Sequence, residues 1–450
     1  MSLSVVILAA GKGTRMFSKL PKVLHKLSNQ PLLQYVINIA KNLNPENINV
    51  VVGYKSKEVE SVFSNEKMNW IIQKKQLGTG DAVRYAIPYL KSTQTIILYG
   101  DVPLVDFNDL KQLIKKSEKG LGILTFKKIN PTGYGRIKRI KNDIEGIVEE
   151  KDCDDLEKKI TEINTGIICV DTSNLINWLS LISNNNSQKE YYLTDIVALA
   201  RKEKIKIRSH EAKSEVSILG INSKIDLAMM ERALQNKKNI LLMEQGVTLL
   251  DPSRTDIRGN LNCESDVEID VGCIFEGKVE VGSNVKIGAY THIKDSVISE
   301  NTIIKPYSHI DSANIGRNNI IGPYARIRPG TETHNDVHIG NFVEIKNSKI
   351  GTGTKVNHLS YVGDSLVGKN VNVGAGTITC NYDGVKKHQT IVEDNVFIGS
   401  NSQLIAPVTI GAGSTIGAGS TITKDTPKNE LSLSRAKQTS IPGWEKPKKS

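Results

Sequence analysis

The first half of the chain alternates short apolar runs with segments of helical periodicity. The runs SVVILAA, INVVVGY, NWIIQ, TIILYGD and GLGILTF have the length and composition of strands buried on both faces of a parallel sheet. Between the first two runs, apolar side chains recur at helical spacing at Leu32, Leu33, Val36, Ile37, Ala40 and Leu43. The stretch GTGDAVRYAIPYL is a second helix candidate. The alternation predicts an α/β domain with a parallel sheet.

The second half has a different period. Aliphatic side chains recur there every six residues, and glycine often follows them, in the series Val281, Ile287, Ile293, then Ile315, Ile321, Ile327, then Ile398, Leu404, Ile410, Ile416, Ile422. A period of six is neither helical nor that of a simple amphipathic strand, and it is the hexapeptide repeat of a parallel β-helix. Six residues at about 3.3 Å each make one flat side of about 20 Å, and we expect about ten coils.

A segment without glycine or proline joins the two halves. Within residues 223–245, Leu227, Met230, Leu234 and Leu241 suggest one apolar stripe, which predicts a long helix. We therefore expect a first domain at 1–222, a linker helix at 223–245 and a β-helix domain with a C-terminal tail at 246–450.

The six-residue repeat is interrupted in two places. VNHLSYVGD (356–364) loosens it, and TITCNYDGVKKHQTI (377–391) departs from it for about a dozen residues. Long excursions from a repeat structure usually lie on its binding face. A neutral insertion, with NYDG as a simple turn, is the alternative.

Composition narrows the function classes. Lysine and arginine number 59 and aspartate and glutamate 48, a net charge of +11. The lysines are spread along the chain, apart from a small basic tail, EKPKKS. A solvated surface is therefore favoured over a nucleic-acid site, and phosphorylated substrates remain compatible.

The five cysteines are scattered without a C-x-x-C pair, which argues against a disulfide scaffold or a zinc site and fits the cytoplasm. No apolar run approaches the roughly 18 residues of a bilayer span, and we interpret the first residues as a core strand rather than a signal peptide.

The loop LAAGKGTRMFSKLPK, residues 8–22, follows the first apolar run. Ligands of α/β sheets bind beyond the carboxyl ends of the strands, so this loop and the one after TIILYGD are candidate sites. The loop lacks both the P-loop spacing and the third glycine of the dinucleotide motif. Gly11 and Gly13 can still present backbone N–H groups to phosphate oxygens, with the charges of Arg15 and Lys22 nearby.

This loop resembles the signature L-A-A-G-x-G-T-R-M-x(4)-P-K of the sugar-nucleotide pyrophosphorylases. The stretches QLGTGDA, YGDVPL, PTGYGRI, GIVEEKD, INTG and GIN follow in the order of the uridylyltransferase branch. In the second half, ARIRPG, NFVEIK, NHLSY, NVGAGTITCNYDG and IGSNSQLIAPV resemble the bacterial bifunctional N-acetylglucosamine-1-phosphate uridyltransferase / glucosamine-1-phosphate N-acetyltransferase family, known as GlmU. The resemblance covers nearly the whole chain. It implies an α/β Rossmann-like nucleotidyltransferase domain followed by a left-handed parallel β-helix acetyltransferase domain.

In the first domain, the resemblance implies transfer of UMP from UTP to N-acetylglucosamine 1-phosphate with release of pyrophosphate. It assigns Mg²⁺ to Asp101 and Asn222, and the catalytic charges on the triphosphate to Arg15 and Lys22. The implied UDP-N-acetylglucosamine positions are Leu8, Ala9, Ala10, Gly11, Lys22, Gln73, Gly78, Thr79, Tyr99, Gly100, Asp101, Gly135, Glu149, Asn164 and Asn222.

In the second domain, the resemblance implies acetylation of glucosamine 1-phosphate by acetyl-CoA, with His358 as general base. Histidine suits this role because an ammonium must lose a proton before it attacks. The backbone N–H of Ala375 is implied for the thioester oxyanion. The implied sugar-phosphate positions are Arg328, Lys346, Tyr361, Asn372 and Asn381, and the implied acetyl-CoA positions are Ala375, Tyr382, Ser400, Ala418 and Arg435.

The resemblance further implies a cytoplasmic homotrimer that makes UDP-N-acetylglucosamine for peptidoglycan and lipopolysaccharide, without nucleic-acid or membrane partners. Two alternatives remain. One is a single-activity pyrophosphorylase whose β-helix only assembles or regulates. The other is a non-catalytic subunit like the exchange factors of translation initiation, which the joint presence of Arg15, Lys22, Asp101 and Asn222 disfavours.

Overall fold

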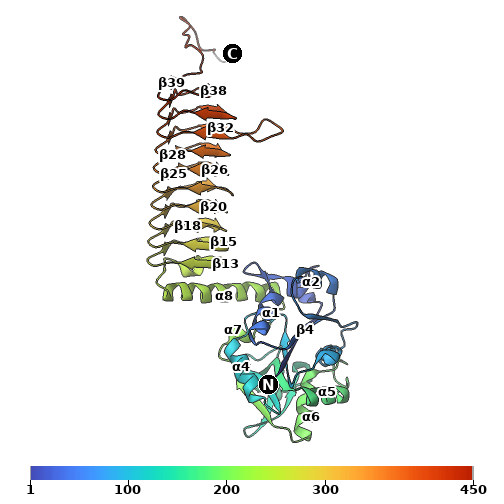
Figure 1. The fold of residues 1–450 in the computed structure, drawn as a ribbon. Coiled ribbons are helices and arrows are strands. Elements are labelled where there is room, and N and C mark those ends of the chain that lie inside the picture. Colours follow the sequence, from blue (N-terminus) through green and yellow to red (C-terminus); the bar gives the residue numbers. More distant parts are fainter. Residues whose placement is uncertain (1, 448–450) are drawn as a thin grey trace. The chain divides into compact units, whose positions relative to one another are not determined.

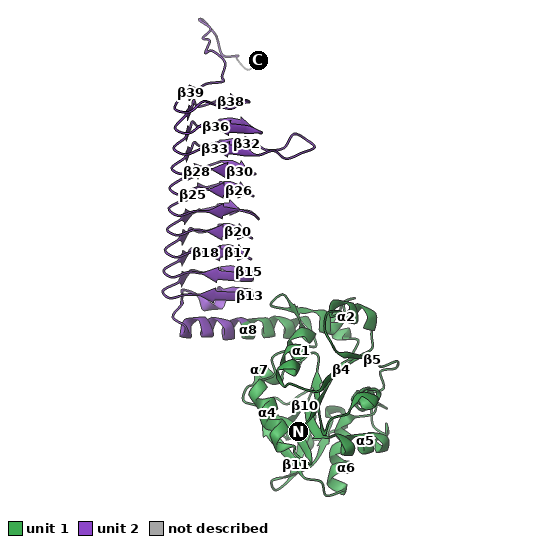
Figure 2. Cartoon of the chain, in the orientation of Figure 1, with its two compact units in different colours: residues 1–234 green, residues 235–450 purple. Residues whose placement is uncertain are grey.

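The computed structural model describes residues 2–447, so the basic tail at 445–450 lies partly outside the described residues. The chain forms two compact units, residues 1–234 and residues 235–450 (Figure 2). The division falls inside the segment 223–245. Each unit is described by itself.

A nine-stranded sheet forms the centre of the first unit, in the order β11-β7-β10-β6-β1-β4-β5, with β8 and β9 joined beside β10. Its strands are β1 (Leu3–Ala9), β4 (Asn47–Val52), β5 (Asn69–Ile72), β6 (Gln94–Tyr99), β7 (Leu121–Lys127), β8 (Arg136–Ile140), β9 (Asp143–Val148), β10 (Glu162–Asp171) and β11 (Ile207–Glu211). The five apolar runs of the sequence form β1, β4, β5, β6 and β7. The predicted strands are therefore confirmed.

The sheet is mixed rather than wholly parallel, which corrects the expectation. β10 runs antiparallel to both of its neighbours, β6 and β7. It follows the β8–β9 hairpin, with which it pairs through Ile163 and Arg136. An antiparallel strand needs no crossover helix, and no α-helix lies between β7 and β10.

Helices cover both faces of this sheet (Figure 1). They are α1 (Leu32–Asn42), α2 (Ser56–Val62), α3 (Thr79–Ala86), α4 (Phe107–Lys116), α5 (Thr172–Leu181), α6 (Ile196–Lys202) and α7 (Glu215–Ile218). One apolar core packs α1, α2 and α4 against the sheet, and a second packs α3, α5 and α6. With both faces covered, the carboxyl ends of the strands are left for ligands.

The predicted long helix is α8 (Lys224–Glu244). Met230 and Leu234 pack with Leu27, Leu32 and Ile221 in the first unit. Further along α8, the Gln235 side chain bonds the backbone of Ile257, accepting from its N–H at 2.7 Å and donating to its carbonyl at 3.1 Å. This residue caps the first coil of the second unit.

The second unit is a parallel β-helix, drawn as stacked coils in Figure 1. One sheet of 11 strands runs from β12 (Thr248–Leu249) to β39 (Leu431–Ser432), and a 17-stranded sheet from β13 (Asp256–Cys263) to β38 (Thr421–Ile422) forms the rest of the coil wall. Every aliphatic residue of the three predicted six-residue series is buried. The period of six therefore marks the inward positions, as predicted.

The coils around the interrupted repeat carry the second candidate site. Their strands are β23 (Arg326–Ile327), β25 (His338–Asn341), β26 (Glu344–Lys346), β28 (Lys355–His358), β29 (Tyr361–Gly363), β31 (Asn372–Val373), β32 (Ile378–Cys380), β33 (Thr390–Val392), β34 (Phe397–Ile398) and β37 (Thr415–Ile416). Between β32 and β33 the chain leaves the coil in one long loop, visible in Figure 1. This loop is the excursion that the sequence predicted.

Candidate active sites

The glycine loop after β1 shapes the first site. Gly13 has a φ of +63°, and a Cβ there would lie 2.7 Å from the Cβ of Lys22. A larger residue at this position would be strained and would displace Lys22. Gly13 therefore serves local packing as well as any contact with phosphate.

Lys22, Asp101 and Asn222 meet although they lie far apart in the sequence. The Lys22 Nζ contacts the Asp101 carboxylate and donates to the Asn222 Oδ1 at 3.0 Å. Asn222 is held in turn by Asp226, whose carboxylate accepts from the Asn222 backbone N–H at 2.9 Å. Two side-chain oxygens thus converge on one cation.

This arrangement fits a magnesium ion. Both converging atoms are the oxygen ligands that Mg²⁺ prefers, and the ammonium between them shows that the position accepts positive charge. Among residues 2–447 no group of three His, Cys, Asp or Glu side chains is placed to hold a metal. Two protein ligands completed by substrate phosphates is the usual magnesium arrangement at phosphoryl-transfer sites.

Three cavities open around Tyr99, which lines all of them. The first, about 230 Å³, is lined by Leu8–Gly11, Lys22, Gln73, Gly78, Thr79 and Asp101 among others. These are residues that the sequence resemblance assigned to the nucleotide. Gly100 lies outside the three linings, and its N–H donates to the Leu8 carbonyl at 2.9 Å.

Gln73 is buried at the wall of the first cavity. Its amide nitrogen donates to the Asp81 carboxylate at 2.8 Å and to the Gly78 carbonyl at 3.3 Å. Gly78 itself has a φ of +110°, and a Cβ there would clash with the Tyr191 backbone. The fixed amide nitrogen leaves the Gln73 Oε1 as a hydrogen-bond acceptor for a ligand.

A second cavity, about 280 Å³, brings together Gly135, Glu149 and Asn164. The Glu149 carboxylate accepts from the Thr194 hydroxyl at 2.9 Å, and burial raises the pKa of Glu149 despite that hydrogen bond. Burial, followed by the charges of Glu149 and Asp152, raises the pKa of nearby Asp195 to about 6. This end of the site is partly desolvated, which strengthens polar contacts to a ligand.

The third cavity, about 510 Å³, contains Arg15, Asp101 and Asn222. Arg15 is exposed, whereas the Asp101 side chain is 14 % exposed. Arg15 and both predicted metal positions thus line this cavity, whereas Lys22 lines the first cavity, and Asp101 lines both.

In the second unit, the implied base and four of the five implied acetyl-CoA positions form one column along a corner of the coil. Asn341 and His358 are paired in register, and the Val356–Val373 pair continues that register to Ala375. Hydrogen bonds extend the column, from Asn401 N–H to the Ala375 carbonyl at 2.7 Å and from Gly419 N–H to the Ser400 carbonyl at 2.8 Å. Arg435 donates to the Ala418 carbonyl at 2.9 Å and closes the column.

Ala375 is placed next to His358 with its amide available. The N–H of the following residue, Gly376, donates to the His358 carbonyl at 3.3 Å. Within the described residues the Ala375 N–H donates to no protein acceptor. It is therefore an available donor one coil away from the His358 ring.

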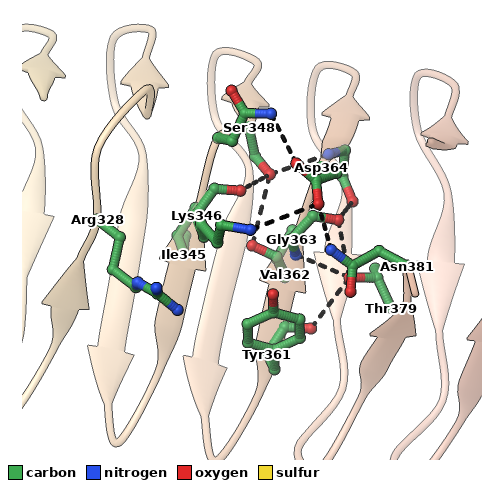
Figure 3. Close-up of polar contacts among 12 residues, drawn as sticks. Arg328, Ile345, Lys346, Ser348, Tyr361, Val362, Gly363, Asp364, Thr379 and Asn381 are labelled. Atoms are coloured by element: carbon green, nitrogen blue, oxygen red, sulfur yellow. Dashed lines mark hydrogen bonds and ion pairs between the residues drawn. The ribbon is translucent and has the colours of Figure 1, made fainter. Parts of the chain in front are cut away.

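A polar cluster lies on the adjoining sheet (Figure 3). Lys346 forms an ion pair with Asp364 at 3.7 Å, and the Asn381 amide donates to the same carboxylate. Arg328 pairs with Glu344 at 2.7 Å, and Tyr361 lies beside Lys346 in the figure. Two cations, one tyrosine and one asparagine thus lie on neighbouring coils of the same sheet.

Asn372 and Tyr382 are not hydrogen-bonded to that cluster in the described part of the chain. Asn372 lies on β31, which belongs to the 11-stranded sheet rather than to the sheet of Lys346. Tyr382 lies in the excursion, is 60 % exposed, and donates to the Gly384 carbonyl at 2.6 Å. Within one described chain, neither side chain hydrogen-bonds another implied ligand position.

Three residues of this site were missed from the sequence. Asp364 joins Lys346 to Asn381, and Asn341 hydrogen-bonds His358. Lys387 lies in the excursion close to Lys346, and the nearby Lys346 ammonium lowers the pKa of Lys387, while the charge of Asp364 raises it. The excursion itself was the signal for Lys387, whereas nothing in the spacing distinguished Asn341.

Comparisons with known proteins agree with this organisation. Residues 5–135 match the MobA-like NTP transferase domain family, residues 257–331 the GMPPB C-terminal domain, and residues 389–424 the bacterial transferase hexapeptide family with six repeats. No helix among residues 2–447 is long and apolar enough to cross a bilayer.

Curated relatives match over the full length. The "Bifunctional protein GlmU" of Nitrosomonas europaea is 54% identical over 100% of this chain and 99% of its own length. The proteins of the same name from Nitrosospira multiformis and Acinetobacter baumannii are 52% and 50% identical, each over at least 98% of both chains.

Fold and sites together define a nucleotidyltransferase joined to a hexapeptide-repeat acyltransferase, two transferases in one chain. At half identity or better over full length, the chain belongs to the GlmU family of bifunctional proteins. Its first unit belongs to a class of transferases that generally depend on a metal.

Proposed function

We propose that the chain makes UDP-N-acetylglucosamine in two steps at two sites. The second unit acetylates glucosamine 1-phosphate with acetyl-CoA, and the first unit then transfers UMP from UTP to the N-acetylglucosamine 1-phosphate so formed. The observation that carries the proposal is the presence of two separate groupings of candidate catalytic residues in one chain. Lys22, Asp101 and Asn222 converge in the first unit, and the Asn341–His358–Ala375 column stands in the second.

At the first site the chain must hold two anionic substrates in line. A phosphate oxygen of the sugar phosphate attacks the α-phosphorus of UTP, and the bond to the β-phosphate breaks to release pyrophosphate. Arg15 and Lys22 neutralise the charge that develops on the triphosphate. The Gln73 Oε1 is a suitable acceptor for the N3–H of the uracil ring, and Glu149 and Asn164 bind the N-acetyl sugar.

Asp101 and Asn222 would hold Mg²⁺, which would supply positive charge to the substrate phosphates. Lys22 binds the triphosphate in exchange for its contact with the two oxygens. Its position between them supports this exchange, because it keeps the two oxygens together before any substrate binds.

At the second site, His358 removes a proton from the ammonium of glucosamine 1-phosphate. The amine nitrogen bonds to the thioester carbonyl carbon, the Ala375 N–H stabilises the oxyanion, and the carbon–sulfur bond breaks. The departing CoA sulfur takes up a proton, which leaves an amide and free CoA. Ser400, Ala418, Arg435 and Tyr382 contact the cofactor.

Arg328, Lys346 and Lys387 together bind the phosphate of glucosamine 1-phosphate, with Tyr361, Asn372 and Asn381 around the sugar. The proximity of the Lys346 and Lys387 ammonium groups supports this proposal, because their mutual repulsion is relieved when a dianion lies between them. Asp364 holds Lys346 in place until then.

Asn372 lies on the other sheet from Lys346, and Tyr382 is exposed in the excursion, which supports a trimer in which neighbouring copies complete the site. The product would supply peptidoglycan and lipopolysaccharide synthesis in the cytoplasm. A pyrophosphorylase with a purely structural β-helix is the second candidate, and the hydrogen-bonded His358 beside an unpaired Ala375 N–H argues against it.

The test is a substrate-omission assay. Purified protein receives glucosamine 1-phosphate, acetyl-CoA, UTP and Mg²⁺, with one component left out in turn. UDP-N-acetylglucosamine should form only in the complete mixture. Its formation without acetyl-CoA would contradict the order of steps, and N-acetylglucosamine 1-phosphate supplied directly should remove the need for acetyl-CoA.

A further inference from the structure

Asn341 and His358 occupy the same corner position of successive coils. They are paired in register between β25 and β28, and the Asn341 Oδ1 lies 2.8 Å from the His358 Nδ1. The backbone also holds His358, whose carbonyl accepts from the Ser360 hydroxyl at 2.8 Å. The ring is therefore held by the Asn341 side chain, while its backbone is held by Ser360.

The contact determines which ring nitrogen carries the proton. An amide oxygen accepts hydrogen bonds and cannot donate them, so Nδ1 carries the hydrogen when it faces the Asn341 Oδ1. The neutral ring then has its lone pair on Nε2. Within residues 2–447 no hydrogen bond uses Nε2, and His358 is exposed, so that lone pair is free to accept a proton from a ligand.

An amide differs from a carboxylate in this position. A carboxylate beside Nδ1 would stabilise the protonated ring, whereas a neutral amide orients the ring without adding charge. A general base must be neutral before it accepts a proton. A partner that orients the ring without stabilising its protonated form therefore suits a base that works near neutral pH.

Few charged groups near His358 could change the protonation of its ring. On β25 the titratable group is His338, and on β28 itself it is Lys355, while β31 brings Asn372 and Val373, which do not titrate. Across the corner the adjoining strands bring Glu344 and Tyr361, and Glu344 is paired with Arg328.

We infer that Asn341 is a positioning residue for acetyl transfer, which holds His358 as the Nδ1–H tautomer with Nε2 ready to accept the substrate proton. The inference rests on the proposed role of His358 as general base. It concerns the acetyltransferase site alone.

The test compares Asn341→Ala and Asn341→Asp in the full-length protein. In Asn341→Ala, kcat of acetylation should fall by about tenfold or more, with little change in the KM for glucosamine 1-phosphate. In Asn341→Asp, activity should be kept at high pH, while the acid limb of the kcat/KM profile moves by about one unit to higher pH. Both variants should keep wild-type uridyltransfer and thermal unfolding, which shows that they fold.

A matched control is Asn284→Ala, which removes another asparagine contact between successive coils, from Asn284 to Asn301 at 3.2 Å. It should leave the acetylation kinetics unchanged. The ¹⁵N shifts of the His358 ring, assigned by comparison with His358→Gln, should show Nδ1 protonated in the neutral wild-type protein and a mixture of tautomers in Asn341→Ala.

Unchanged kcat and pH profile in Asn341→Ala would overturn the inference, as would a wild-type ring protonated mainly at Nε2. If His358→Ala itself retained acetylation, the proposed function of the second unit would fail instead. The two failures are therefore distinguishable.

Discussion

The ammonium of Lys22 lies against the carboxylate of Asp101, and the same ammonium donates to the Asn222 amide at 3.0 Å. The lysine belongs to the glycine loop and Asp101 follows β6, so the contact joins the two loops that end neighbouring strands. One cation thus holds together the two oxygens that we assign to Mg²⁺. Lysine and metal cannot occupy that position together.

Replacing Lys22 should therefore separate metal binding from catalysis. In Lys22→Met, Mn²⁺ used in place of Mg²⁺ should bind at least about tenfold more tightly without nucleotide, because like charges about 4 Å apart repel by about 1–4 kcal/mol. Uridyltransfer should fall at the same time, since the triphosphate loses a cation. Electron paramagnetic resonance of free Mn²⁺ measures the first effect.

The matched control is Lys19→Met, a change of exposed lysine in the same loop. It should alter neither Mn²⁺ binding nor uridyltransfer by more than about twofold. Weaker Mn²⁺ binding in Lys22→Met would show that the lysine supports the metal rather than replaces it.

Lys387 tests the phosphate site of the second unit. Lys387→Ala should raise the KM for glucosamine 1-phosphate by about tenfold and leave the KM for acetyl-CoA nearly unchanged, because a charge-assisted contact to a phosphate is worth about 1.5–3 kcal/mol. Steady-state kinetics with each substrate varied in turn measures both values. The neighbouring change Lys386→Ala serves as control, and equal effects of the two changes would refute a specific contact.

Asp195 should make the stability of the first unit depend on pH. Burial and the charges of Glu149 and Asp152 raise the pKa of Asp195 to about 6, above its ordinary value of 3.8. Between these values the folded state holds more protons than the unfolded state, so the free energy of unfolding falls as pH rises from about 4 to about 6.

Asp195→Asn should remove this fall in the free energy of unfolding with rising pH, because asparagine does not ionise. Its Tm should match the wild type at pH 4 and exceed it by about 1–3 °C at pH 7.5. The exposed Asp155, whose side chain is 98% exposed, provides the control Asp155→Asn. A constant Tm difference across this range would show that the Asp195 effect is not one of ionisation.

Much of the fold follows from local periodicity. Ile398, Leu404 and Ile410 are inward at each sixth position because one flat side of the coil takes six residues. Strand direction does not follow from periodicity, because an apolar run has the same pattern in a parallel and in an antiparallel strand. The sequence pattern therefore predicted a parallel sheet and did not predict β10, which pairs antiparallel with β6 and β7.

For the candidate sites too, motifs in the sequence predict individual residues, whereas their contacts depend on the fold. Motif order identified Asp101 and Asn222, but their meeting with Lys22 depends on three loops that approach only in the folded unit. Asn341 looks in sequence like the many asparagines at coil corners, such as Asn318 and Asn370, which have positive φ values and turn the chain. Its contact with His358 needed the register of two coils.

The central claim is that one chain carries two chemically independent transferases. It is tested most directly by assaying both half-reactions separately in Asp101→Ala and in His358→Ala, with thermal unfolding as the check on folding. We expect Asp101→Ala to lose UDP-N-acetylglucosamine formation by at least about a hundredfold and to keep acetylation, and His358→Ala to show the reverse. Loss of both activities in either folded variant would contradict the account.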